Sequence, residues 1–169
     1  MTIISGTAYW AKLMAPDTEH DSDGQWSIVV GDLDKKNADI ARASGLTVKN
    51  NDEQIKAKGS QWVMGDHITL KRNARNKKTG EMNSPPSVVD AQRRPIMDTE
   101  VGNHSLITVK YSPWKWNYKG KHGVSGDLTV VQVTDLVVYT REGDDLEGIE
   151  VVPGGYTGEG LDEDITLAS

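Results

Sequence analysis

Residues 105–118, SLITVKYSPWKWNY, and residues 127–139, DLTVVQVTDLVVY, are the two segments that decide the fold class. In both, apolar and polar side chains alternate, the period of a β-strand with one buried face. The apolar residues of the first segment form two groups, one on each side of Pro113: Ile107, Val109 and Tyr111, then Trp114, Trp116 and Tyr118. Because proline cannot donate a ladder hydrogen bond, we expect the strand to bulge at Pro113.

The second segment changes its apolar phase twice. Its apolar pairs are Leu128/Val130, Val131/Val133 and Leu136/Val138. A long strand that bends between two sheets shows such changes, so this segment is expected to curve.

Upstream of these segments the sequence predicts further short strands and one helix. Residues 2–14 and 25–30 read as a hairpin around a polar turn, and residues 68–71 and 87–91 read as strands. Asp34 can cap a helix that Gly45 ends. Five or six strands with a single short helix favour a mainly β protein with a small closed barrel over a parallel α/β sheet.

The 169 residues fit one domain with a tail. We place the domain at residues 1–141 and a flexible tail at residues 142–169, which combine nine carboxylates with glycine and proline. The absence of cysteine excludes disulfides, zinc–thiolate sites and thiol catalysis. No apolar run is long enough for a membrane helix and the N-terminus lacks a signal pattern, so a soluble intracellular protein is expected.

Charge is divided unevenly along the chain. Residues 49–122 hold 14 basic and 7 acidic side chains, whereas residues 123–169 hold 1 basic and 11 acidic side chains. This division indicates a basic surface for a polyanion and an acidic tail, although a mixed solvated surface explains the counts equally well.

Residues 110–121 combine four aromatic and four lysine side chains. Aromatic rings stack on unpaired bases while lysines contact phosphates, which is how proteins hold single strands without reading sequence. A basic run, and a separate Arg93-Arg94 pair, could extend such a surface; the run contains Lys71, Arg72, Arg75, Lys77 and Lys78. In the alternative interpretation Trp114 and Trp116 are core residues and the lysines only solvate the strand.

These residues resemble the replication single-stranded-DNA-binding proteins of short-tailed, podovirus-type phages. The resemblance is carried by VKYSPWKWN at 109–117, GVS at 123–125, VVD at 88–90 and the Pro95-Ile96 pair, and it is good from about Met64 to Tyr139.

The resemblance implies an OB-fold barrel that binds single-stranded DNA, a homodimer, and an acidic tail that recruits phage DNA polymerase and the primase–helicase. It therefore predicts an OB-fold-like five-stranded barrel that works in the cytoplasm of the infected host cell. Members of the family end in an aromatic residue, whereas this sequence ends in Leu167-Ala168-Ser169. Docking of partners through the tail is therefore less well supported than DNA binding.

The expected function is to coat single strands during phage replication and recombination, with the tail regulating access to DNA. The predicted stacking residues are Tyr111, Trp114 and Trp116, then Tyr118 and Trp10. The predicted phosphate contacts are Lys71, Arg72, Arg75, Lys110, Lys115, Lys119 and Lys121.

No catalytic residue, metal ligand or cofactor is expected. A calcium-loop-like run ending at Gly24 has Val30 where the last ligand should be, and neither phosphate-loop nor nucleophile motifs occur. Two other classes stay open: a virion or carbohydrate-binding β module whose aromatics stack on sugars, and an OB-fold nuclease. Steep salt dependence would favour DNA over a neutral glycan.

Overall fold

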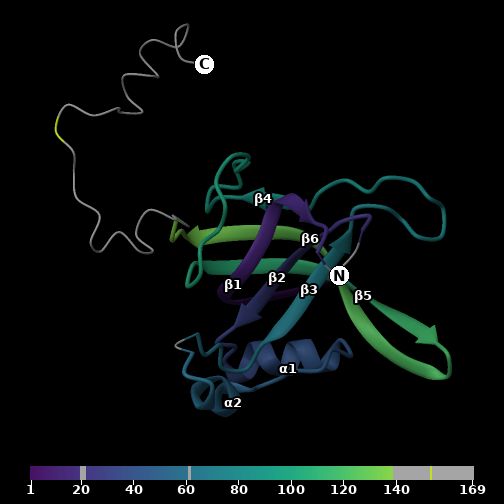
Figure 1. Ribbon diagram of the computed structural model, residues 1–169, viewed down its shortest axis with the longest axis horizontal. Coiled ribbons are helices and arrows are strands. Elements are labelled where there is room, and N and C mark those ends of the chain that lie inside the picture. Colours follow the sequence, from purple (N-terminus) through teal and green to yellow (C-terminus); the bar gives the residue numbers. More distant parts are fainter. Residues whose placement is uncertain (20–21, 61, 139–152, 154–169) are drawn as a thin grey trace, which may run out of the picture. The chain divides into compact units, whose positions relative to one another are not determined.

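Six strands and two helices make up the described part of the chain, which covers residues 1–19, 22–60, 62–138 and 153 of this computed structural model (Figure 1). The strands are β1 (Thr2–Asp17), β2 (Gln25–Gly31), β3 (Ile68–Asn73), β4 (Ser87–Val89), β5 (Leu106–Tyr118) and β6 (Lys121–Asp135). The helices are α1 (Lys35–Ala43) and α2 (Asp52–Ala57).

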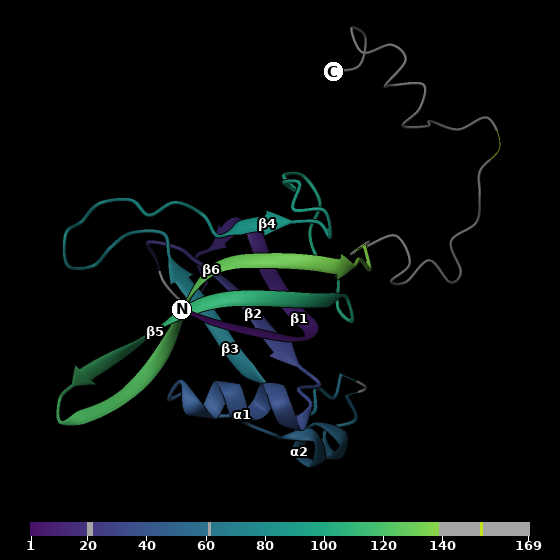
Figure 2. The same cartoon turned by 180° about the vertical axis from the view of Figure 1, so that it is seen from behind.

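The strands close into a ring. The sheet order is β3-β2-β1-β5-β6-β4, and an additional parallel bridge between Lys71 of β3 and Asp127 of β6 joins the two ends of the five-stranded part (Figures 1 and 2). The remaining strand, β4, pairs in parallel with β6 outside this ring. The mainly β, OB-fold-like five-stranded barrel expected from the sequence is confirmed, and the β1–β2 hairpin is present as predicted.

The core fills the inside of the ring from alternating positions. On β3, Ile68 and Leu70 are buried whereas Thr69 and Lys71 are exposed, as the alternation predicts. The neighbouring strands contribute in the same way, and the largest fully buried apolar side chains are Tyr9, Tyr111, Ile4, Ile28, Leu70, Ile107 and Leu128.

Two bulges in β6 account for the changes of apolar phase in its sequence. Lys110 pairs with Val130 but Tyr111 pairs with Leu128, which leaves Thr129 as an extra residue, and a second shift likewise leaves Thr134 extra. Each extra threonine donates its hydroxyl to a β5 carbonyl, at 3.0 Å for Thr129 and 3.1 Å for Thr134. Across these bulges Leu128, Val131 and Val133 stay buried, whereas Val130 is partly buried and Leu136 and Val138, which follow β6, are exposed.

The bulge expected at Pro113 is wrong. Pro113 pairs in register with Gly126, and the pairing of β1 with β5 ends at Tyr111. From that residue on, β5 has only β6 as a neighbour, and a proline on such an edge needs no bulge.

The helix α1 lies across one end of the barrel and begins where the sequence predicts (Figures 1 and 2). Asp34 caps it by accepting a hydrogen bond from the Asn37 backbone at 2.8 Å, which holds the pKa of the Asp34 carboxyl below its usual value. Ala38 and Ala41 face the core, and Gly45 follows with φ +100°.

The expectation of a single helix is wrong, because the six residues of α2 form a second one. None of them is buried, so this helix lacks the apolar stripe by which a sequence reveals a helix. The tail predicted from residue 142 lies outside the described residues except for Pro153, and the boundary at residue 141 stays a prediction.

Candidate nucleic-acid interface

The ends of β5 and β6 leave the barrel together as a two-stranded arm, residues 114–125 (Figure 1). Lys119 and Gly120 connect the strands, and their φ angles of +49° and +79° are those of the two-residue turn that matches strand twist. Trp114, Trp116 and Tyr118 share one face of the arm by the two-residue period of a strand.

These three rings differ in surroundings. Trp114 is 49% exposed and Tyr118 is 66% exposed, whereas Trp116 is half-buried. Trp116 lies over Gly123 on the opposite strand, where an added Cβ would stand only 2.6 Å from its ring. The arm therefore presents Trp114 and Tyr118 to solvent and uses Trp116 partly for its own packing.

Tyr111 does not belong to this surface. Its side chain is fully buried, and its hydroxyl lies 2.8 Å from the Ser44 hydroxyl. Burial raises the pKa of the Tyr111 phenol, while the hydrogen bonds with Ser44 and Thr2 partly oppose that rise. The prediction that Tyr111 stacks on a base is wrong for this structure, because the ring would have to leave the core.

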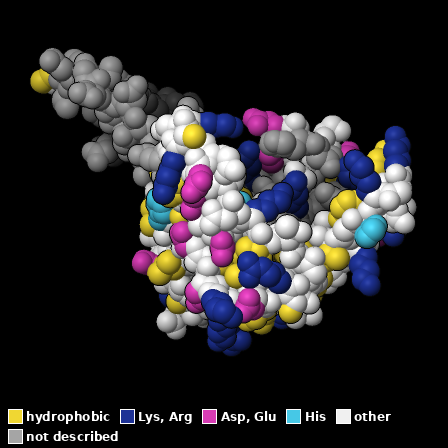
Figure 3. Space-filling view, turned by 90° about the horizontal axis from the view of Figure 1, so that it is seen from below, with side chains coloured by type: hydrophobic (Ala, Val, Ile, Leu, Met, Phe, Trp, Pro, Cys, Tyr) yellow, Lys and Arg dark blue, Asp and Glu magenta, His cyan; other side chains and the backbone are white. Residues whose placement is uncertain are grey.

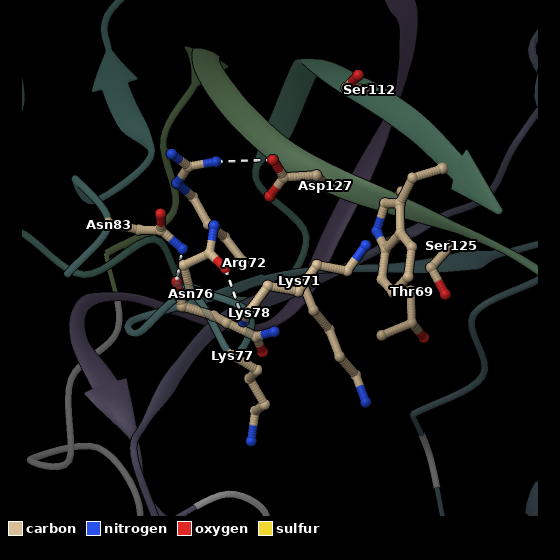
Figure 4. Close-up of a pocket in the computed structure, with 13 residues that line it drawn as sticks. Thr69, Lys71, Arg72, Asn76, Lys77, Lys78, Asn83, Ser112, Ser125 and Asp127 are labelled. Carbon is tan, nitrogen blue, oxygen red and sulfur yellow. Dashed lines mark hydrogen bonds and ion pairs between the residues drawn. The ribbon is translucent and has the colours of Figure 1, made fainter. Parts of the chain in front are cut away.

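A groove of about 700 Å³ lies between β3, the loop of residues 74–83 and the base of the arm. In Figure 3, lysine and arginine side chains lie beside a hollow of the surface and along the projecting part. The lining residues include one aromatic ring and several cations: Thr69, Lys71, Arg72, Asn73, Asn76, Lys77, Lys78, Asn83, Ser112, Trp114, Ser125, Gly126 and Asp127 (Figure 4). Of the predicted residues, this groove brings together Trp114, Lys71 and Arg72.

The 74–83 loop presents Lys77 and Lys78 to the groove through a turn built by Asn76. The Asn76 side-chain oxygen accepts hydrogen bonds from the backbone of Lys78 at 2.9 Å and of Thr79 at 3.2 Å. Asn83 ties the loop to β3 by donating to the Asn73 carbonyl at 2.8 Å. The two lysines therefore extend from an anchored turn.

The two predicted arginines have partners within the protein. Arg72 is 2.7 Å from Asp127 and also donates to the Ser84 carbonyl at 2.8 Å. Arg75 donates to the Gly80 carbonyl at 2.7 Å and does not line the groove. Their role as phosphate contacts stays a prediction.

A second, smaller groove of about 210 Å³ continues over the outer face of β1, β2 and β3. It shares Thr69 and Lys71 with the first groove and reaches Trp10 and Lys12 on β1. The surface that begins at Trp114 thus passes Lys71 and continues to Trp10.

Trp10 is displayed by a bulge in β1. Between Tyr9 and Lys12 the chain advances one residue more than β2 does, and Trp10 has φ +52° with 46% of its surface exposed. The Asn103 side-chain oxygen accepts a hydrogen bond from the Trp10 backbone N–H at 2.8 Å. The Trp62 ring packs edge-on against the Trp10 ring, with the ring centroids 5.6 Å apart. A non-glycine residue in this region of φ is strained, and such strain is concentrated at functional sites.

The remaining predicted lysines lie away from both grooves. Lys110 pairs with Ile3 and Val130 on the barrel, and it lines neither groove. Lys115 alternates with the arm's aromatic residues, so it points to the arm's other face. Lys119 and Lys121 flank the tip, where the Lys119 ammonium is 5.3 Å from the centre of the Tyr118 ring.

Several groove residues escaped the sequence analysis. Thr69 comes from β3, Ser112 from β5, and Ser125 and Asp127 from β6, and the closing of the barrel brings Thr69 to the others. Lys77 and Lys78 were foreseen only as part of a basic run.

Other features of the described residues give no sign of a metal site or a membrane span. Within residues 1–19, 22–60 and 62–138, no three His, Cys, Asp or Glu side chains gather where they could hold a metal ion. In the same part of the chain, every helix is too short or too polar to cross a membrane.

Comparison with known proteins finds relatives by structure alone. No family model matches the sequence, and no curated protein matches it. Among solved structures, the single-stranded DNA-binding protein of bacteriophage Enc34 in complex with ssDNA is 15% identical, with a TM-score of 0.58 over 79% of this chain and 85% of that chain. The gp2.5 single-stranded DNA-binding protein of bacteriophage T7 is 23% identical, with a TM-score of 0.52 over 92% of this chain and 98% of that chain.

A C-terminally truncated form of the Enc34 protein matches similarly, at 14% identity and a TM-score of 0.57. The fold of this chain is therefore that of phage single-stranded-DNA-binding proteins, and the resemblance seen in the sequence is confirmed at the level of the fold.

Proposed function

We propose that this chain is a phage protein that binds single-stranded DNA without catalysing a reaction, and that it coats single strands during replication and recombination. The observation that carries the proposal is the groove in which the exposed ring of Trp114 lies beside Lys71, Lys77 and Lys78. The shared fold supports it, since one solved neighbour is described as a complex with ssDNA.

In this proposal Trp114 stacks on a base at the foot of the arm, and Tyr118 and Trp116 offer further rings along it. Each stacked base contributes about 1–3 kcal/mol, and any base can stack because every base has a flat apolar face. The three groove lysines contact phosphates, which releases counterions and makes affinity fall with salt. Lys115, Lys119 and Lys121 add positive potential around the arm.

The second groove extends the same path. Lys71 belongs to both grooves, so a strand that leaves Trp114 can follow Lys71 over β3 and β2 toward Trp10. We propose Trp10 as a second stacking ring on this path.

Partner proteins belong to the proposal only by resemblance. We propose a homodimer, regulation of DNA access by the acidic residues 142–169, and recruitment of the phage DNA polymerase and primase–helicase through them, in the cytoplasm of the infected host. A tethered polyanion at high local concentration would compete with DNA for the basic groove.

Titration of intrinsic tryptophan fluorescence with oligo(dT) at two salt concentrations tests the central claim. We expect quenching by DNA, with weaker binding at the higher salt concentration. Lack of quenching by a folded protein would contradict the proposal, and salt-independent binding of a neutral glycan would support a carbohydrate-binding module instead.

The variant Trp114→Ala separates stacking from packing. We expect an affinity loss of about 1–3 kcal/mol with an unchanged melting temperature, because the ring is half exposed. Leu106→Ala is the matched control, since Leu106 lies on the same strand, is 47% exposed and lines neither groove.

A further inference from the structure

One carboxylate stands inside the basic groove. Among the residues that the structure describes, Asp127 is the only acidic side chain lining the groove beside Trp114. It lies on β6 at the single bridge to Lys71 of β3, and its side chain is 37% exposed. A negative charge at this place opposes a polyanion, so it needs an explanation beyond general solvation.

Asp127 pairs with Arg72, the cation that would otherwise face bound DNA. Its Oδ2 atom is 2.7 Å from Nη1 of Arg72, the length of a charge-assisted hydrogen bond (Figure 4). The Arg72 Nε atom donates to the Ser84 carbonyl at 2.8 Å, which fixes the plane of the guanidinium group. Arg72 is thus oriented within the groove, and only 20% of its side chain is exposed.

The rest of the groove has the opposite charge. Figure 4 shows Arg72 and Asp127 facing each other, with Lys77 extending away from the pair. DNA in the groove therefore meets the cations Lys71, Lys77 and Lys78 as well as the Arg72–Asp127 ion pair.

We propose that Asp127 is an internal competitor for the DNA phosphate at Arg72, and that it sets how tightly the groove holds a strand. Asp127 accepts a hydrogen bond from Nη1 of Arg72 while Nε donates to Ser84, so a phosphate competes with the carboxylate for the same guanidinium N–H groups. The inference rests on the proposed function, because it concerns the same groove and the same ligand.

Such a competitor lowers affinity at one point of the groove without removing any contact elsewhere. While Asp127 holds Arg72, bound DNA lacks the phosphate contact that this arginine would otherwise make, and the guanidinium group keeps an anionic partner. A protein that coats single-stranded DNA and must later release that DNA to enzymes gains faster release in this way. Because interface changes act mainly on dissociation, we expect the effect of Asp127 in the off-rate.

The test is the variant Asp127→Asn, titrated with oligo(dT) across a series of salt concentrations. Removing one nearby like charge should tighten binding by about fivefold at low salt. Release of Arg72 to a phosphate should also steepen the slope of log K against log salt by about 0.7, the value for one phosphate contact on a single strand. Unchanged or weaker binding by the folded variant would overturn the proposal.

Two controls separate competition at Arg72 from a general effect of net charge and from a structural role of Asp127 at the junction of β3 and β6. Asp98→Asn removes the same charge from an exposed residue that lines neither groove, and it should not change the salt slope. Asp127→Glu keeps the carboxylate and should not tighten binding. Tightening by either variant equal to that of Asp127→Asn would overturn the competition.

A double variant tests the part of Arg72. In the Asp127→Asn background, Arg72→Gln should abolish the gain in affinity and the added slope, and persistence of the gain would rule out competition at Arg72. If Asp127→Asn lowers the melting temperature, Asp127→Ser measured well below the transition gives the same comparison. Failure of the unaltered protein to bind oligo(dT) would instead refute the proposed function itself.

Discussion

The barrel part and the arm part of β5 both carry large aromatic residues, but they differ in how far these residues are buried. Tyr111 and Trp114 are three residues apart on one strand, yet Tyr111 is fully buried and Trp114 is 49% exposed. Up to Tyr111 the strand is covered by β1 and by the core, and beyond it only β6 remains as a neighbour. An aromatic residue there is buried or presented to solvent according to whether the rest of the barrel covers it, which the residue type alone does not reveal.

The largest expected effect lies in the barrel part. Tyr111→Ala should destabilise the protein by about 3–5 kcal/mol, because it leaves a cavity in the core and removes the hydrogen bond between the Tyr111 and Ser44 hydroxyls. Chemical denaturation measures this loss. Tyr111→Phe removes only the hydroxyl and should keep the DNA affinity unchanged. A clear loss of DNA affinity in Tyr111→Phe would break the comparison, since the Tyr111 hydroxyl would then have to contact DNA.

Two glycines opposite these aromatic residues sharpen the comparison. An added Cβ at Gly126 would stand 2.5 Å from Leu70 and 2.9 Å from Tyr111, so Gly126→Ala should cost about 1–3 kcal/mol of stability through overpacking. Gly123→Ala crowds the Trp116 ring on the arm, where the added Cβ would stand 2.6 Å from that ring. We expect it to alter DNA affinity more than the melting temperature, and the reverse result would show that the arm shares in the core.

Lysines that line the grooves and lysines that do not should differ in salt dependence. Lys71→Ala should make the slope of log K against log salt shallower by about 0.7, because Lys71 lines both grooves. Lys110→Ala should change it less, since Lys110 lines neither groove. Lys36→Ala on α1 is the control for net charge. Equal slopes for the Lys71 and Lys110 variants would contradict this division.

The smallest expected effect is a loss of stability of the barrel domain at low pH. Hydrogen bonds from the Asn37 and Arg94 backbones hold the pKa values of Asp34 and Asp90 below their usual range. A carboxyl with a lowered folded pKa stabilises the protein above its unfolded pKa of about 3.9, and that contribution is lost as pH falls further. Thermal melts from pH 6 to pH 3 should show a small loss that Asp34→Asn reduces, whereas Asp98→Asn leaves it unchanged.

The sequence predicted the strands because alternation is local, and the same alternation separates the apolar residues of β5 into two phases. Ile107, Val109 and Tyr111 fall in one phase and Trp114, Trp116 and Tyr118 in the other, and the structure buries only the first group fully. Assigning Tyr111 to DNA overlooked that phase. The bulges at Thr129 and Thr134 were visible as phase changes, but their exact positions depend on pairing with β5.

The composition of the groove was less predictable. Arg72 and Asp127 are 55 residues apart, and they meet only because β3 and β6 close the ring. Counting charges places Asp127 in the acidic C-terminal part of the chain, whereas the fold places it in the basic groove. Contacts between distant segments of this kind have no local signal in the sequence.

The single bridge between Lys71 and Asp127 also makes β3 and β6 the weakest joint of the ring. The other adjacent strands of the ring share several paired residues, so we expect the amides beside this joint to exchange with solvent sooner than those between β5 and β6. The floor of the groove lies over the joint. Bound DNA would then hold β3 and β6 together, and deuterium uptake at residues 70–72 and 126–128 would decrease when DNA binds.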